Sequence, residues 1–108
     1  MIAFDDREKA FEAKFARDQD AQFRITARRN RLLGEWAAER MGLTPEETDA
    51  YAKAVVQADF EEAGDEDVIR KLAGDLTAAQ VEIGDAEIRA ALNDKAVEAR
   101  RQFIDEQG

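Results

Sequence analysis

Three phenylalanines near the N-terminus are the residues of this chain best suited to molecular recognition. Phe4, Phe11 and Phe15 are separated by seven and four positions, so on a helix their rings fall along one side. The first 20 residues also carry ten charged side chains, six acidic and four basic. A segment this charged gains little free energy by folding alone. The pattern predicts an arm that becomes helical when another surface accepts its rings.

An alternative is that these residues are simply the first turns of a long helix that folds onto the body of the protein. The arm interpretation is favoured because the segment lacks the aliphatic neighbours that would fill a core, and because its charge is too dense for a buried element.

The residue types needed for most catalytic and metal sites are missing. The chain contains no Cys and no His, which excludes disulfides, cysteine nucleophiles and zinc sites of the usual kind. Carboxylate pairs are abundant, but nothing singles one out for acid–base catalysis. There is no Glu-x-x-His motif and no glycine-rich phosphate loop. We therefore expect no enzyme activity, no cofactor and no metal.

The acidic stretch that begins at Asp59 resembles a calcium loop at first sight. Gly64 stands at the required sixth position, but the fifth position is Ala63 and the twelfth, which must be a bidentate Glu, is Arg70. Two helix ends that meet, with Asp65 capping the second helix, explain the stretch better.

The net charge of −9 disfavours nucleic acid as a partner, although one stretch is basic. Residues 21–40 carry five Arg against two Glu, and the cluster at 28–31 could bind phosphate. We favour a solvated helix face in which these arginines pair with Glu35 and with acidic residues of neighbouring helices.

The sequence otherwise predicts one all-α domain of four helices. One Pro and six Gly interrupt 108 residues that are dominated by strong helix formers. Gly42 is expected to end the first helix, and Thr44 with Glu47 to form a capping box. Ile83 is expected to pack on Ile88 across the start of the last helix. The first predicted helix begins between residues 18 and 22 and ends at residue 41. The other three cover residues 45–63, 66–80 and 85–106.

Apolar residues at three-to-four spacing predict the inward side of each helix. Trp36 and Tyr51 are assigned to this core rather than to an interface. The residues expected to face inward are Ile25, Leu32, Leu33, Trp36, Ala37, Arg40, Tyr51, Val55, Val56, Ala58, Phe60, Val68, Ile69, Leu72, Leu76, Ile88, Leu92, Ala96, Ala99, Phe103 and Ile104. With neither an apolar signal core nor a membrane span in the sequence, we expect a cytoplasmic protein without direct membrane insertion.

Four stretches of this sequence resemble the zeta subunit of the alphaproteobacterial F-type ATP synthase. They are Phe-Asp-Asp-Arg-Glu-Lys-Ala-Phe-Glu-Ala-Lys-Phe at 4–15, Ala-Arg-Arg-Asn-Arg-Leu-Leu-Gly-Glu-Trp-Ala-Ala-Glu at 27–39, and Asp-Ala-Tyr-Ala-Lys at 49–53 with Ala-Asp-Phe-Glu-Glu-Ala-Gly-Asp-Glu-Asp-Val at 58–68. The resemblance covers nearly the whole chain and is loosest in its C-terminal quarter.

The resemblance implies a four-helix bundle at 20–108 with a mobile, inhibitory N-terminal arm at 1–19. It implies that the arm binds the catalytic head of the synthase between alpha and beta subunits, close to the gamma subunit of the central stalk. This would block rotation in the direction of ATP hydrolysis and place the protein at the periphery of the inner membrane. The alternative is a stand-alone helical adaptor or a weak ATP- or ADP-binding module that does not act on the synthase.

On this hypothesis the arm contacts its partner through both rings and charges. Phe4, Phe11 and Phe15 would enter apolar pockets, and charged neighbours would form pairs at the rim that set orientation more than affinity. The charged candidates are Asp5, Asp6, Arg7, Glu8, Glu12 and Lys14.

Overall fold

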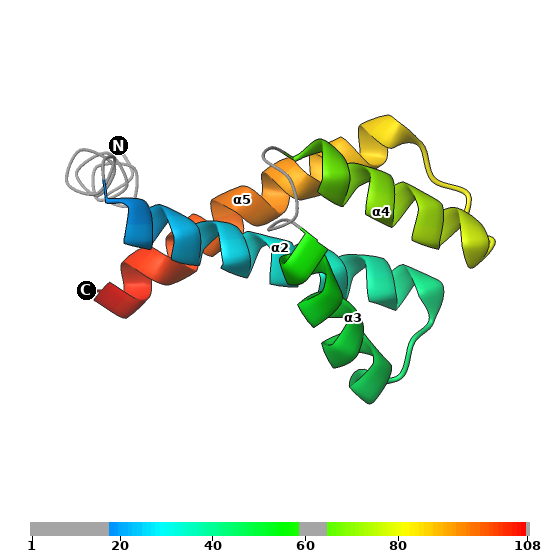
Figure 1. Ribbon diagram of the computed structural model, residues 1–108, viewed down its shortest axis with the longest axis horizontal. Coiled ribbons are helices and arrows are strands. Elements are labelled where there is room, and N and C mark those ends of the chain that lie inside the picture. Colours follow the sequence, from blue (N-terminus) through cyan, green and yellow to red (C-terminus); the bar gives the residue numbers. More distant parts are fainter. Residues whose placement is uncertain (1–17, 59–64, 108) are drawn as a thin grey trace.

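A computed structural model describes residues 18–58 and 65–107, and over these ranges the chain forms four α-helices and no strand (Figure 1). The helices are α2 (Gln19–Met41), α3 (Pro45–Ala58), α4 (Glu66–Ala78) and α5 (Asp85–Gln107). The predicted all-α four-helix bundle is confirmed. α4, the third of the predicted helices, ends two residues before its predicted end at 80. The predicted end of α3 at residue 63 lies outside the described residues.

The turn between α2 and α3 forms as its sequence predicts. Gly42 has a left-handed φ of 73°, and its N–H points at the carbonyls of Ala38 and Glu39. The Thr44 N–H donates to Glu47 Oε1 at 2.8 Å, and the Glu47 N–H donates to Thr44 Oγ1 at 3.2 Å. This reciprocal pair is a capping box, and it satisfies backbone donors that the first turn of α3 would leave unpaired.

The start of α4 differs from the prediction. Asp65 occupies the N-cap position, but its side chain makes no capping hydrogen bond and its backbone is helical, with φ −86° and ψ −10°. Its Oδ1 lies instead 3.0 Å from Nη2 of Arg29 on α2. The carboxylate therefore pairs with a guanidinium on another helix instead of with the N–H groups of its own first turn, because the charged donor gives the stronger bond.

The start of α5 agrees with the prediction. The Gly84 carbonyl accepts hydrogen bonds from the N–H groups of Glu87 and Ile88 at 3.1 and 3.2 Å. Ile83 packs against the hydrophobic cluster that contains Ile88. The direct contact between Ile83 and Ile88 stays a prediction.

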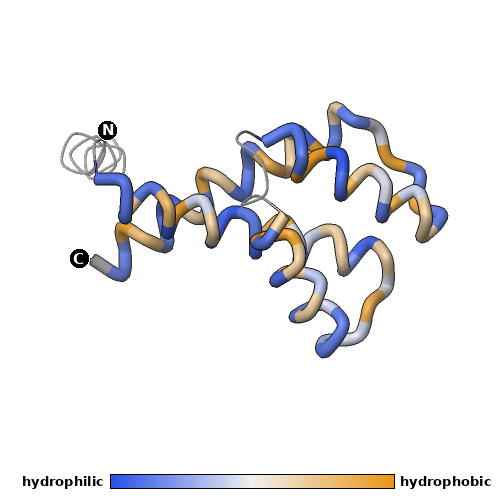
Figure 2. The backbone as a smooth tube through the Cα atoms, in the orientation of Figure 1, coloured by the Kyte–Doolittle hydropathy of each residue, from blue (hydrophilic) through white to orange (hydrophobic). Residues whose placement is uncertain are grey.

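Within the described residues, the core consists of two clusters arranged along α2, which the sequence did not predict. The larger cluster joins the C-terminal half of α2 to α3, α4 and the first turns of α5, through Leu33, Ala37, Val55, Val68, Ile69, Leu72, Leu76, Ile88, Ala91 and Leu92. The smaller cluster of described residues joins the first turns of α2 to the last turns of α5, through Ala21, Ile25, Ala99, Phe103 and Ile104, and Leu32 packs against it. Apolar residues are interspersed with polar ones along α2 and α5 (Figure 2).

The prediction of buried residues is best for α4 and weakest for α3. The four apolar positions predicted on α4 are all buried. On α3, Val55 is buried, whereas Tyr51, Val56 and Ala58 are only partly buried. The inward side of α3 is narrow because its contact with α2 centres on the small residue Ala52. Phe60, also predicted to be buried, lies outside the described residues.

Four further predicted core positions lie at the edge of the core. Leu32, Trp36 and Ala96 are partly exposed, and Arg40 is exposed. The Arg40 guanidinium lies over the Trp36 ring, 4.7 Å from its centroid, so Arg40 covers this ring from the solvent side. Within residues 18–58 and 65–107, none of the helices combines the length and the hydrophobicity that a transmembrane span requires.

Gly34 sets how closely α2 approaches α3. A Cβ atom at this position would lie 2.8 Å from Cα of Ala52 and 3.2 Å from Cγ2 of Val55. The first of these atoms belongs to the backbone and cannot move aside as a flexible side chain could. Gly74, in the middle of α4, has no such neighbour within 4 Å.

These two glycines provide a matched test of the α2–α3 contact. Gly74→Ala should stabilise the protein by up to about 1 kcal/mol, because Ala favours the helix and nothing obstructs its methyl group. Gly34→Ala should instead destabilise it by about 1–2 kcal/mol, since overpacking outweighs the same gain in propensity. Urea unfolding followed by circular dichroism measures both. Equal stabilisation by the two variants would contradict the close approach.

Candidate partner-binding site at the N-terminal end

The nine residues predicted to contact a partner lie outside the residues that the structure describes. They are Phe4, Asp5, Asp6, Arg7, Glu8, Phe11, Glu12, Lys14 and Phe15. Their roles remain predictions. The structure does describe the part of the molecule to which they are attached, which consists of Asp18, the first turns of α2 and the last turns of α5.

Asp18 forms the junction between the predicted arm and α2. Its backbone is extended, with φ −83° and ψ 100°, and its side chain accepts hydrogen bonds from the N–H groups of Asp20 and Ala21. Asp18 is thus a well-formed N-cap. The sequence prediction placed the helix start only within 18–22. An Asp followed two residues later by another acid is the signal that could have fixed it.

An ion pair joins α2 to the end of α5 beside the smaller cluster. Arg28 and Glu106 meet through two contacts, Nη1 to Oε1 at 2.7 Å and Nη2 to Oε2 at 2.8 Å. The hydrogen bonds from Arg28 lower the pKa of Glu106. A lowered folded-state pKa means that the pair stabilises the fold above the ordinary pKa of Glu and loses this contribution as the pH falls through the lowered value.

A groove of about 420 Å³ lies next to this ion pair. Its lining combines apolar side chains with three arginines and one carboxylate: Phe23, Ala27, Val56, Phe103, Arg24, Arg28, Arg31 and Glu106. Phe23 on α2 is 54% exposed. The groove therefore contains apolar side chains, and carboxylates of the same chain pair with its arginines: Asp20 with Arg24, Glu106 with Arg28 and Asp49 with Arg31.

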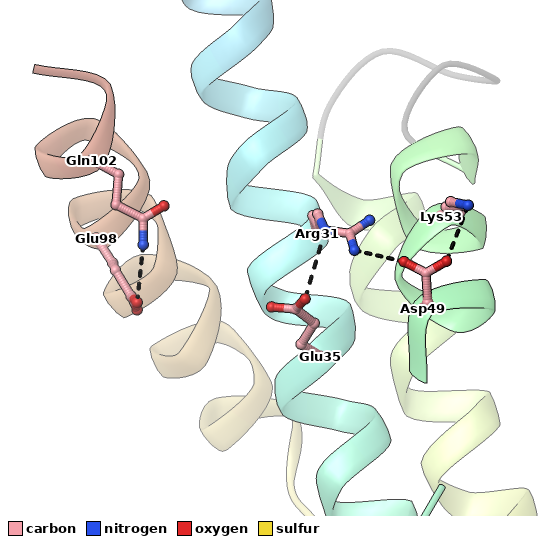
Figure 3. A network of polar contacts seen from close by, with 6 residues as sticks. All are labelled: Arg31, Glu35, Asp49, Lys53, Glu98 and Gln102. Carbon is pink, nitrogen blue, oxygen red and sulfur yellow. Dashed lines mark hydrogen bonds and ion pairs between the residues drawn. The ribbon is translucent and has the colours of Figure 1, made fainter. Parts of the chain in front are cut away.

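Arg31 shows this pairing most clearly (Figure 3). Its Nη2 lies 2.6 Å from Oδ1 of Asp49 on α3, and its Nε lies 3.6 Å from Oε2 of Glu35 on the same helix. Lys53 Nζ approaches the other Asp49 oxygen at 3.0 Å. The bond from Arg31 is the main reason that the pKa of Asp49 is lowered. The same view shows a separate contact on α5, where Gln102 Nε2 lies 3.4 Å from Glu98 Oε1.

Arg29 is the most buried guanidinium of the cluster, with its side chain 11% exposed. Besides pairing with Asp65, it donates from Nε and Nη2 to Oδ1 of Asn30, at 3.1 and 2.9 Å. Asn30 is 1% exposed, and within the described part of the chain its Nδ2 is the buried side-chain atom without a hydrogen-bond partner. The sequence grouped Asn30 with the charged face and gave no signal that it is buried.

The predicted pairing of the basic stretch is therefore confirmed for Arg31 with Glu35 and for arginines that reach acids on other helices. The competing phosphate-binding interpretation loses support, because a phosphate would have to displace these carboxylates. Among the described residues, no group of three or more Asp and Glu side chains is placed to hold a metal ion.

Tyr51 links α3 to α4. Its hydroxyl donates to Asp75 Oδ2 at 2.7 Å, and Lys71 Nζ lies 3.1 Å from the same oxygen. Lys71 also lies over the Tyr51 ring, 5.2 Å from its centroid. Burial, followed by the hydrogen bond to Asp75, raises the pKa of the phenol. Both Tyr51 and Trp36 pack against the larger cluster, as predicted for core residues, although each is only partly buried.

The comparisons with known proteins agree with this architecture. The solution NMR structure of a protein that is 48% identical to this chain has a TM-score of 0.70 to it, and the match covers 79% of this chain and 96% of that one. No curated protein matches the chain. The sequence model of the ATPase inhibitor subunit zeta family matches residues 1–102, including the predicted arm and all but the last turns of α5. The chain therefore belongs to the ATPase inhibitor subunit zeta family.

Proposed function

We propose that this protein inhibits ATP hydrolysis by the F-type ATP synthase. The observation that carries the proposal is the family match over residues 1–102, since an inhibitor family indicates a regulatory and non-catalytic role. The proposed partners are the alpha, beta and gamma subunits of the catalytic head, reached from the cytoplasm at the periphery of the inner membrane. No cofactor takes part in the proposed action.

The proposed inhibitory element is the arm at residues 1–19. It enters an interface between alpha and beta subunits as a helix and blocks rotation there. Rings at positions 4, 11 and 15 share one side of such a helix, so one apolar groove of the head can accept all three. The charged residues between them remain at the rim, where they select the orientation of the helix.

The bundle at residues 20–108 serves as the base that holds the arm in place. The smaller cluster and the Arg28–Glu106 pair fasten the first turns of α2 to the end of α5. At the end where the arm begins, the described part of the base therefore consists of two helices packed together, α2 and α5. In this proposal the base stays outside the interface and limits how far the arm can enter.

Removing the arm should abolish inhibition without unfolding the base. We expect a variant lacking residues 1–17, which keeps the Asp18 cap of α2, to retain the helical circular dichroism of residues 18–108 and to lose inhibition of ATP hydrolysis by the purified head. The reason is that the described core uses no residue before Ala21. Full inhibition by this truncated protein would defeat the arm proposal.

Single ring truncations locate the contact within the arm. Phe4→Ala, Phe11→Ala and Phe15→Ala should be compared in a titration of the head, and at least one should weaken binding by more than about 1 kcal/mol, because a buried ring is a typical hot spot. Phe23→Ala is the matched control, since Phe23 lies on α2 beyond the arm and is exposed. The proposed residues would be wrong if only the control lost affinity.

A further inference from the structure

A hollow of about 250 Å³ lies between the C-terminal half of α2 and the first half of α5. Trp36 and Arg40 line it from α2, and the lining from α5 includes Glu87, Ala90, Ala91 and Asp94. Trp36 follows the Asp18 cap by 18 positions, which is about 27 Å along α2. This Trp36 hollow is therefore far from the end of the bundle to which the predicted arm is attached.

The Trp36 ring already holds one cation. The ring packs against the larger cluster, and the guanidinium of Arg40 lies 4.7 Å from its centroid. Tryptophan is the aromatic side chain that attracts cations most strongly. Among the described residues, Arg40 forms no ion pair with a carboxylate, so the ring is the contact that attracts its charge. The surroundings of Trp36 thus accommodate a planar cation.

The wall on α5 combines two carboxylates with small apolar side chains. Glu87 and Asp94 are seven positions apart, which is about two turns, so they lie on the same side of the helix. Ala90 and Ala91 occupy the turn between them. Because their side chains are single methyl groups, they leave open the space that the hollow occupies. This space is bounded along α5 by a carboxylate at each end.

The two carboxylates are not neutralised by the described part of the chain. Lys95 also lines the hollow, but its Nζ pairs with Glu98 Oε2 at 3.2 Å. Within residues 18–58 and 65–107, neither Glu87 nor Asp94 forms an ion pair. The groove beside Phe23 differs, because carboxylates of the chain pair with its arginines. In a chain of net charge −9, the Trp36 hollow is therefore suited to a cation from outside.

An arginine side chain fits these features better than other cations. Its planar guanidinium stacks on aromatic rings and donates in parallel to a carboxylate, whereas the ammonium of lysine is a compact point charge. Arg40, Glu87 and Asp94 are all exposed, so the hollow is open to solvent at its border. Sites for small molecules bury most of their ligand. An open hollow instead suits one side chain that projects from a longer chain lying across the surface.

We propose that the Trp36 hollow is a docking site for an arginine side chain on a basic segment of a partner protein. The guanidinium enters between Glu87 and Asp94, pairs with at least one of their carboxylates and lies against Trp36. This inference goes beyond the proposed function, because it concerns a surface remote from the arm. Binding at this surface does not require the arm.

The fluorescence of Trp36 tests the proposal directly, since Trp36 is the only tryptophan of the chain. The full chain is titrated with a capped Gly-Ala-Arg-Ala-Gly peptide and, separately, with the same peptide carrying Gln in place of Arg. The arginine peptide should change the emission saturably, with a Kd on the order of 1 mM, as expected for a single exposed side chain. The glutamine peptide should not change it.

Two variants that remove the same charge separate the site from general attraction to an acidic protein. Asp94→Asn removes a carboxylate of the hollow and should raise the Kd of the arginine peptide about two- to fivefold, the range for one exposed ion pair. Glu46→Gln is the matched control, since Glu46 is an exposed acid of α3 that does not line the hollow. It should leave the Kd unchanged.

Two further variants test the space and the ring while both carboxylates remain. Ala90→Leu should raise the Kd about tenfold or more, because the larger side chain fills space that the guanidinium needs. Arg40→Gln should lower the Kd about two- to fivefold, since it removes a like charge and uncovers the Trp36 ring. Circular dichroism checks that each variant keeps the helical fold.

Three results would overturn the inference. The first is that the glutamine peptide changes the emission as the arginine peptide does. The second is that Glu46→Gln weakens binding as much as Asp94→Asn does, and the third is that Ala90→Leu leaves binding unchanged. None of these measurements involves the ATP synthase, so a failure of the proposed function is recognised separately.

Discussion

The close contact of α2 with α3 is the constraint on which the rest of the fold depends. Gly34 lets the two backbones lie so close together that a Cβ atom added at position 34 would clash with Cα of Ala52. α2 also packs against α4 and α5, so its position fixes the other three helices. The small residues Ala37, Ala38 and Ala52 are fully buried, and Ala52 lies at this contact. From sequence alone, the many alanines indicate helical propensity. In the fold, small side chains such as Ala52 also allow the helices to pack closely.

Much of the fold could be predicted because its signals are local. Gly42, Thr44 and Glu47 act within one turn of the chain, and the apolar positions of α4 repeat at helical spacing. Asp65, Asn30 and the division of the core could not be predicted in the same way. Asp65 satisfies the local rule for an N-cap, but a guanidinium 36 positions earlier in the chain takes its carboxylate. Local patterns contain no information about such distant partners.

The candidate site, too, could be predicted only in part from the sequence. The sequence identifies the ring spacing of the arm and the basic stretch at 21–40, and the pairing of the latter with acids of other helices is confirmed. The particular partners, such as Glu106 for Arg28, depend on how α2 crosses α5. These pairs neutralise the basic stretch within an acidic chain. Charge alone is therefore a poor guide to where this protein binds, and the apolar rings of the arm become the better candidates.

The division of the core has a consequence for the dynamics of the protein. Asn30, whose amide nitrogen has no hydrogen-bond partner within the described residues, lies on α2 between the positions that build the two clusters. Among the described residues, the smaller cluster on the N-terminal side of Asn30 is built from α2 and α5. Amide protons in the first turns of α2 and the last turns of α5 should exchange with solvent before those of α4 do, since local opening there exposes less apolar surface. Within the described residues, this end of the bundle should thus open more readily than α4.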